Sequence, residues 1–336
     1  MDSLTHTVIG AVVGDAFAGR RLGKKAMLWG ALINNLPDID VLTSFWMTQA
    51  SGLLAHRGFT HSILFMVIMT PLLAYGLHGR YKTTSSYQDW LWLSGSNLFI
   101  HLFIDALTAY GTGWFEPFSH ERVSLNMFFV ADPLYTLPFI VGAIALMILR
   151  RGSPKRISWH RIGILWGVFY LLFAGWNKYR INQEVTSNVA EQRLPVHDFI
   201  STPTPLNNFL WYVIAQGDSG YYIGYRSVFD PKTPMAFTYI SRNDALLTPW
   251  KDDPEVGKLI RFSEGIYRLD QEDGQTVFSD MRFGQIGGWM DPKANFAFRF
   301  YLDRPDGNDL VIQRGRMEAS TPEALKSLWN RMWGQP

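Results

Sequence analysis

The first half of the chain contains four long apolar stretches, each close to the length of a membrane-spanning helix. Each is slightly shorter than the ~20 residues that cross the hydrocarbon core of a bilayer. Aromatic residues at their ends, such as Trp90 and Trp176, extend them into the membrane interface. Buried helices of a soluble protein are the alternative, which the close spacing of the stretches and the basic clusters between them disfavour. The pattern predicts four spans, at Ser62–Leu77, Trp90–Leu107, Leu134–Leu149 and Ile162–Trp176.

Two shorter apolar segments, Leu4–Ala18 and Ala26–Leu36, precede these stretches and flank a strongly basic linker. At about 1.5 Å per residue, neither is long enough to cross a bilayer comfortably. We therefore expect a helical hairpin packed against the spans.

The basic residues of this half indicate its orientation. They gather in loops that alternate with the expected spans so as to lie on one side, which the positive-inside rule makes cytoplasmic. The opposite side then receives residues 37–61, residues 108–132 and everything after Trp176. We expect a multi-pass protein of the bacterial inner membrane, with its C-terminal domain in the periplasm or outside. The basic loops are Arg20–Lys25, Gly79–Lys82 and Arg150–Arg156.

After Trp176 the pattern changes to short runs rich in Tyr, Phe, Ile and Val, separated by Gly, Asp and Pro. Such runs are typical of strands, and Asp273-Gly274 is a hairpin signal between two of them. A closing helix is expected at Pro322–Trp333. The predicted strands are Tyr221–Phe229, Met235–Ile240, Lys258–Leu269, Thr276–Phe283, Phe296–Leu302 and Leu310–Met317.

The expected fold is an α-helical polytopic membrane domain followed by an antiparallel β-rich (α+β) soluble domain. We place the transmembrane domain at residues 1–176, with the hairpin and about four spans, a connector at 177–206 and the β-rich extracytoplasmic domain at 207–336.

Composition sharpens this picture. The formal net charge is +2, which gives no general attraction for nucleic acid, so we expect no nucleic-acid partner. Only nine of the 29 acidic residues lie in residues 1–176. The chain contains no cysteine, which excludes disulfides, cysteine zinc fingers, iron–sulfur clusters and thiol nucleophiles.

Seven of the eight histidines lie in the apolar half, where ionisable groups are costly and are functional candidates by default. His101 and Asp105 are four residues apart, so on a helix their side chains share a face and can reach one ion. A hydrogen-bonded helix-packing pair is an equally good interpretation of these two residues alone.

Three other elements favour a metal site. Asp38 and Asp40 follow Pro37, although these residues are also typical of a helix-ending turn. His56 and His61 directly precede an expected span, where His61 could simply lie at the helix start. His6 lies near the start of the first apolar segment, where a buried, hydrogen-bonded histidine is the more ordinary interpretation.

Under the expected topology, nearly all of these residues fall toward the non-cytoplasmic side. Nitrogen and oxygen ligands without sulfur suit Zn²⁺, Mn²⁺ or Fe²⁺. We take Zn²⁺ as the first choice and expect one or two ions, an arrangement typical of phosphoester hydrolysis. The predicted metal ligands are His6, Asp38, Asp40, His56, His61, His101 and Asp105.

The sequence resembles the YdjM-like family of bacterial membrane-bound, metal-dependent hydrolases over roughly its first 180 residues. The resemblance implies a metal-dependent hydrolase and assigns no substrate. A more distant similarity links the order of His6, Asp38 or Asp40, His56 and His101/Asp105 to zinc-dependent bacterial phospholipase C. The matching motifs are Asp2-Ser-Leu-Thr-His6-Thr, Leu36-Pro-Asp-Ile-Asp40, His56-Arg-Gly-Phe-Thr-His61-Ser, His101-Leu-Phe-Ile-Asp105-Ala-Leu-Thr-Ala-Tyr-Gly111 and Asp132-Pro-Leu-Tyr-Thr.

We expect a membrane-embedded hydrolase that cleaves a phosphoester, or a related bond, of a lipid or lipid-linked envelope substrate by metal-activated water. Asp40, Asp105 and His61 are the expected catalytic residues. Asp132 could complete the metal cluster or cap a helix, and Arg57 is a candidate for holding a phosphate.

Two other functions remain open. In the first, the protein is a non-catalytic envelope protein with a structural metal, whose β domain binds a partner protein or a glycan. In the second, intramembrane His and Asp residues relay a metal ion or protons, which their clustering at one face disfavours.

Overall fold

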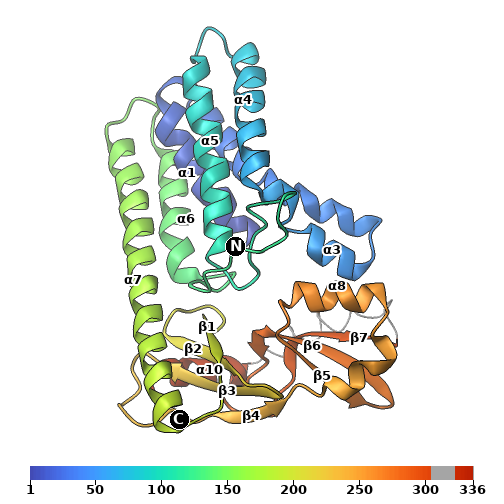
Figure 1. Cartoon of the computed structure of the whole chain (residues 1–336). Helices are drawn as coiled ribbons and strands as arrows, with labels where there is room; N and C mark the ends of the chain where they lie inside the picture. The colour runs from blue at the N-terminus through green and yellow to red at the C-terminus, as the bar shows by residue number, and fades with distance from the viewer. Residues whose placement is uncertain (304–321, 336) are drawn as a thin grey trace. The chain divides into compact units, whose positions relative to one another are not determined.

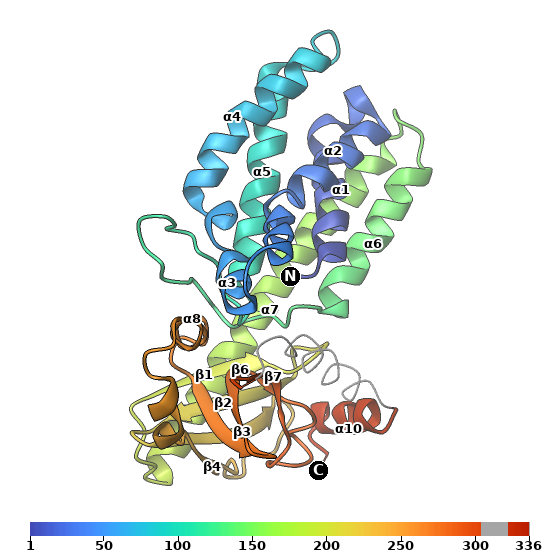
Figure 2. The ribbon, with the colours of Figure 1, turned by 90° about the vertical axis from the view of Figure 1, so that its right-hand side faces the viewer.

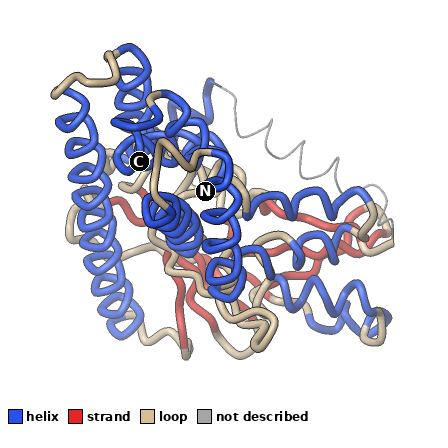
Figure 3. Tube along the Cα trace, turned by 90° about the horizontal axis from the view of Figure 1, so that it is seen from above, coloured by secondary structure: helices blue, strands red, loops and turns tan. Residues whose placement is uncertain are grey.

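The structure is a computed structural model that describes residues 1–303 and 322–335. It divides into two units (Figure 1). The first unit comprises residues 1–45 and 55–174, and the second comprises residues 46–54 and 175–336. Helices form the first unit, whereas the described strands named below all belong to the second (Figure 3).

Two antiparallel helices open the first unit and confirm the predicted hairpin. They are α1 (Ser3–Leu22) and α2 (Lys24–Asn34), joined at Gly23 with a φ of +62°. Glycines on facing sides allow the backbones to touch, because a Cβ atom at Gly30 would lie 2.0 Å from the Gly10 carbonyl oxygen. No residue larger than glycine fits at this crossing.

The four apolar stretches all form helices: α4 (Ile63–Arg80), α5 (Tyr87–Ala106), α6 (Pro133–Ile148) and α7 (Lys155–Glu191). Side chains fix where three of them begin. Ser62 accepts a hydrogen bond at the start of α4, Ser86 and Asp89 form a capping box on α5, and Asp132 caps α6.

Two described helices, α4 and α7, are long and apolar enough to cross a membrane, where the sequence predicted four. The other two fall short for different reasons. α6 has only 16 residues, and α5 carries polar side chains such as Asn97, His101 and Asp105 that lower its hydropathy. Most of the residues in the apolar stretches of α4 and α7 are not buried by other parts of the chain.

Between α2 and α4 lie three short helices that carry candidate ligands or lead to them. They are the 3-10 helices η1 (Pro37–Phe45) and η2 (Phe59–His61), and the α-helix α3 (Gln49–Ala55).

The second unit contains two antiparallel sheets (Figure 2). The four-stranded sheet has the order β1 (Asp198–Pro203), β2 (Leu210–Gln216), β3 (Gly220–Ser227), β4 (Thr238–Ser241). The three-stranded sheet has the order β5 (Tyr267–Glu272), β6 (Gln275–Gln285), β7 (Phe296–Tyr301). The helices of this unit include η3 (Asp244–Trp250), α8 (Pro254–Phe262) and α10 (Pro322–Met332).

The structure confirms the predicted hairpin turn and the closing helix. Asp273 and Gly274 join β5 to β6 with φ angles of 49° and 75°, which suit this residue pair. The strand predicted at Lys258–Leu269 is wrong in its first half, because helix α8 extends to Phe262. Asp253 caps the start of this helix. The segment expected as a connector contains the end of α7 and strand β1. The strand predicted at Leu310–Met317 lies outside the described residues.

Candidate metal centre

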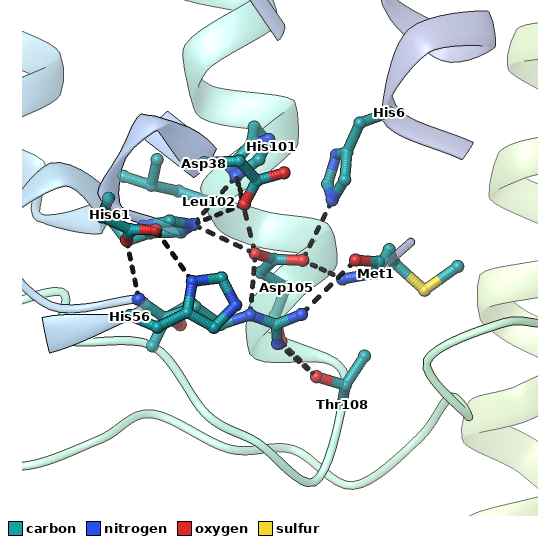
Figure 4. A network of polar contacts seen from close by, with 12 residues as sticks. Met1, His6, Asp38, His56, His61, His101, Leu102, Asp105 and Thr108 are labelled. Carbon is teal, nitrogen blue, oxygen red and sulfur yellow. Dashed lines mark hydrogen bonds and ion pairs between the residues drawn. The ribbon is translucent and has the colours of Figure 1, made fainter. Parts of the chain in front are cut away.

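The His and Asp residues singled out in the sequence converge in the first unit (Figure 4). Asp38 and Asp40 lie on η1, and His61 ends η2 immediately before α4. His101 and Asp105 lie one turn apart on α5. Two short 3-10 helices and one α-helix therefore bring together residues that are up to 67 positions apart.

Four ligand atoms face one another at the centre of this network, and we call Asp38, His61, His101 and Asp105 the inner group. The Nε2 atoms of His61 and His101 lie 3.0 Å apart. From His61 Nε2, Asp38 Oδ1 is at 3.4 Å and Asp105 Oδ2 at 3.3 Å. From His101 Nε2, the same two oxygens lie at 3.6 and 3.5 Å.

These distances fit a tetrahedral cation. Bonds of about 2.0–2.1 Å around tetrahedral zinc place neighbouring ligand atoms about 3.3 Å from one another. A single hydrogen on His61 Nε2 cannot serve three neighbours at once, whereas a cation can. Asp105 Oδ2 is buried and lies within ion-pair distance of His61, His101 and Arg57, so this oxygen faces nitrogen atoms on several sides.

Asp38 also belongs to a second cluster with Asp40 and His56, which we call the outer group. His56 Nδ1 lies 2.8 Å from Asp40 Oδ1. His56 has 30% of its side chain exposed and Asp38 has 20%, so the outer group is open to its surroundings. The two groups share the Asp38 carboxylate.

The inner group creates a strongly negative environment around His61. Burial by itself lowers the pKa of this imidazole, but contacts with Asp105, Asp38 and Asp40 outweigh burial and raise its pKa to about 10. The same field that holds a proton on His61 attracts a divalent cation, which must displace that proton to bind.

Asp40 is held in place from several sides. Its Oδ2 atom accepts hydrogen bonds from the backbone N–H of Arg57 at 2.8 Å and from the Thr60 hydroxyl at 2.9 Å. Burial disfavours its charged form, but hydrogen bonds with His56 and His61 hold its pKa below the ordinary value. Asp40 is therefore ionised at neutral pH and orients both imidazoles.

Asp105 is surrounded by nitrogen atoms in addition to its inner-group neighbours. Its Oδ1 atom contacts the amino nitrogen of Met1 and lies 3.1 Å from His6 Nε2. Arg57 Nε lies 3.2 Å from Oδ2, and Arg57 also donates to the Thr108 hydroxyl at 2.8 Å. These contacts fix the orientation of the Asp105 carboxylate.

His6, predicted as a metal ligand, contacts Asp105 from the side of α1 and is in neither group. Its ring stacks on that of His101, with 3.9 Å between centroids. Its Nδ1 atom faces Asn34 Oδ1 at 3.2 Å, and the Asn34 amide donates to Asn97 on α5. His6 thus positions Asp105 and His101 by its contacts.

The two remaining candidates, Asp132 and Arg57, belong to neither group, and both already have partners in the structure. Asp132 caps α6, and its other oxygen accepts from the Tyr170 hydroxyl. Arg57 is buried and its guanidinium contacts Asp105, so the guanidinium is already paired. Its backbone has a φ of +59°. The geometry favours the capping role for Asp132 and a charge-balancing role for Arg57.

Sequence reasoning missed Met1, Asn34, Thr60 and Thr108 as members of this network. Asn34 fits a helix-ending turn equally well, and nothing in the local sequence marks a terminal amine as buried. Thr60 directly precedes His61, and Thr108 follows Asp105 by three residues. This closeness to candidate ligands is the signal that could have identified both threonines.

Comparison with known families gives a match to the half of the chain that carries these residues. A family described as "YdjM inner membrane protein" matches residues 1–181. The "Inner membrane protein YbcI" of Escherichia coli (strain K12) is 31% identical over 121 residues, which cover 35% of this chain and 69% of that protein.

A second relative extends across both units. The "Uncharacterized protein YfhP" of Bacillus subtilis (strain 168) is 28% identical over 308 residues, which cover 85% of this chain and 88% of that protein. No solved structure matches this chain. The expected similarity to phospholipase C thus stays a prediction.

Proposed function

Because this chain belongs to the YdjM inner membrane protein family, we propose that it is a metal-dependent hydrolase of the bacterial inner membrane. Its substrate is a lipid or lipid-linked envelope molecule, and the bond it cleaves is a phosphoester or a related bond. The observation that carries this proposal is the inner group, in which four ligand atoms lie 3.0–3.6 Å apart across the five pairs given above.

Two divalent ions suit the residues best. His61, His101, Asp38 and Asp105 would hold the first, and Asp38, Asp40 and His56 would hold the second. Nitrogen and oxygen ligands fit Zn²⁺, Mn²⁺ and Fe²⁺, and the tetrahedral spacing of the inner group favours Zn²⁺. Asp40, Asp105 and His61, expected from the sequence to be catalytic, then act as ligands.

A pair of such ions supplies an activated water near neutral pH and stabilises charge on the leaving oxygen. The residues of the chain prepare this chemistry. Asp38 bridges the two groups, and Asp40 orients His56 and His61. Asp38, Asp40 and Asp105 contribute three negative charges, whereas two divalent ions and Arg57 would contribute more positive charge than this. The net positive charge of the site would attract an anionic phosphoester.

The position of the site within the first unit supports a membrane substrate. α4 begins and α5 ends at the site, whereas their other ends lie at the basic loop around Arg80 and Lys82 (Figure 1). By the positive-inside rule the site is on the extracytoplasmic side, near lipid headgroups. Leu137, Val141, Ile144 and Ile148 of α6 are exposed, which supports α6 as a further span beside α4 and α7. The second unit then lies outside the cytoplasm.

Metal analysis of purified protein tests this proposal. We expect about two zinc ions per chain. The ion of the inner group should be lost in His61→Ala and in His101→Ala, and both ions should be retained in the control His197→Ala, whose histidine lies in the second unit. The wild type should release phosphate or a phosphorylated headgroup from a panel of envelope lipids, and both ligand variants should lack this activity. Full metal content in the two ligand variants would overturn the proposal.

A structural metal site is a second candidate, because His61, His101 and Asp105 are completely buried. Structural sites are closed, whereas catalytic sites keep a position open to water. Cobalt substitution separates the two: addition of phosphate changes the cobalt absorption spectrum at an open site and leaves it unchanged at a closed one.

A further inference from the structure

The exposed surface of α7 changes from apolar to polar in the part of this helix that belongs to the second unit. Leu172, Trp176 and Tyr179 are exposed. The exposed residues that follow, from Arg180 to Ser187, are polar. Tryptophan and tyrosine favour the interface between hydrocarbon and water. In a helix long and apolar enough to cross a membrane, this change marks the level at which the helix enters the headgroup region.

Two loops of the second unit are held at this level by hydrogen bonds to α7. The side-chain amide of Asn177 donates to the backbone carbonyl of Asn208 at 3.0 Å. The guanidinium of Arg180 donates to the backbone carbonyl of Val228 at 3.5 Å. All four residues belong to the second unit, so these contacts fix both loops relative to the end of the apolar surface.

The residues that directly follow these contacts, Phe209 and Phe229, stack with Trp333 in one aromatic cluster. The ring centroids of Phe229 and Trp333 are 4.9 Å apart, and the Phe209 ring lies 5.6 and 5.8 Å from them. Trp329 lies 5.8 Å from Trp333. Phe229, Trp329 and Trp333 are 46, 59 and 43% exposed, and we call these three residues the aromatic patch.

The helix α10 carries more apolar surface than its attachment to the second unit uses. Leu328 and Met332 are buried and pack on Leu210 of β2, which holds the helix in place. Trp329 and Trp333 each come one residue later, and both are exposed. A surface helix usually has one apolar stripe that faces its own core and polar residues elsewhere. The second stripe of α10 therefore indicates a contact outside the chain.

Exposed cations accompany the aromatic patch. Lys326 is exposed on α10, three residues before Trp329. Arg180, which contacts Val228, has 43% of its side chain exposed. Long basic side chains beside aromatic rings suit the headgroup region, because the rings occupy the interface while the cations meet lipid phosphates.

We propose that the aromatic patch is a membrane-contact surface, which enters the headgroup region of the same bilayer that α7 crosses. A phospholipid surface is the occupant because the patch lies next to the end of the apolar surface of α7, and because its aromatic and basic residues match that environment. The tether to α7 also gives the patch a high effective concentration at the bilayer. This inference involves no metal ion and goes beyond the proposed hydrolase activity.

Site-directed spin labelling tests it in the full chain, which contains no cysteine. Nitroxides are attached to Trp329→Cys and Phe229→Cys in vesicles of phosphatidylethanolamine and phosphatidylglycerol. Tyr239→Cys on β4 is the matched control, because Tyr239 is an aromatic residue outside the patch with 48% exposure. Leu172→Cys, whose native side chain is 68% exposed on α7, reports the membrane interior.

Collisions with oxygen, which concentrates in the bilayer, are compared with collisions with a water-soluble nickel chelate. We expect the ratio of oxygen to nickel collisions at Trp329→Cys and Phe229→Cys to be several-fold higher than at Tyr239→Cys and below that at Leu172→Cys. Removal of the lipid by detergent exchange should lower the two patch ratios toward that of Tyr239→Cys.

Three outcomes would overturn the inference. In the first, the patch labels collide with the nickel chelate as often as the Tyr239→Cys label. In the second, they are shielded from both reagents and show dipolar broadening between labels, which means that a second copy of the chain covers the patch. In the third, the Leu172→Cys label meets the chelate freely, so that α7 does not cross the bilayer.

Discussion

Within the site, Asp38 and Asp40 are two residues apart but have different surroundings. Asp40 is buried, and its oxygens contact His56, His61, Thr60 and the Arg57 backbone. Asp38 is partly exposed and faces both imidazoles of the inner group. Asp40 therefore organises the outer group, and Asp38 connects it to the inner group.

Replacing Asp40 should affect the two ions unequally. Asp40→Asn removes a ligand charge from the outer group and an orienting contact from His61. We expect the second ion to bind at least 100-fold more weakly and the first about 10-fold more weakly. Zinc titration measures both steps, with the exposed Glu121→Gln as the control. Equal weakening of the two ions would contradict the assignment of Asp40 to the outer group.

The raised pKa of His61 predicts a pH dependence of metal binding. With a pKa of about 10, His61 stays protonated in the metal-free site at neutral pH, and the ion must displace that proton. Affinity should therefore rise about tenfold per pH unit as the pH increases toward about 10 and then level off. Competition with a chelator of known pH response measures this, and an affinity independent of pH between 6 and 9 would contradict it.

At the scale of elements, the α1–α2 hairpin depends on glycine at one contact. Its backbones meet at Gly10 and Gly30, which brings Asn34 of α2 toward His6 of α1. Because His6 and Asn34 support Asp105 and α5, the close crossing contributes to the candidate metal site as well as to packing.

A single methyl group at this crossing should disturb the hairpin. Gly30→Ala places a Cβ atom 2.0 Å from the Gly10 carbonyl and should destabilise the protein by about 1–3 kcal/mol, the usual cost of overpacking. Gly76→Ala on α4 has open space around it and should be neutral or stabilising by up to about 1 kcal/mol. Thermal unfolding in detergent compares the two, and equal melting temperatures would contradict the crossing.

For the whole molecule, the arrangement of basic loops predicts one orientation in the membrane. The chain has no cysteine, so single cysteines can report on sidedness without background. In intact spheroplasts, an impermeant maleimide should label Phe118→Cys, whose native side chain is 83% exposed, and Asp218→Cys in the second unit. Lys82→Cys should react only after the membrane is opened, and labelling of all three in intact cells would contradict the topology.

Much of the site could be predicted from the sequence because its residues are unusual in their setting. His101, Asp105, Asp38 and His61 stand out in an apolar half with few acidic residues, and the spacing of His101 and Asp105 predicts a shared helix face. The number of spans was less accessible, because the same polar residues that mark the site lower the hydropathy of α5.

Local pattern by itself determined the helical hairpin, the positions of the apolar helices, the Asp273-Gly274 turn and the candidate ligand types. These features depend on neighbours within a few residues. Only the tertiary structure decided that His6 lies beside the inner group, that Asp132 caps α6 and that residues 46–54 pack on α8. Such outcomes depend on contacts between residues far apart in the chain, and hydrophobic periodicity carries no information about which distant surfaces meet.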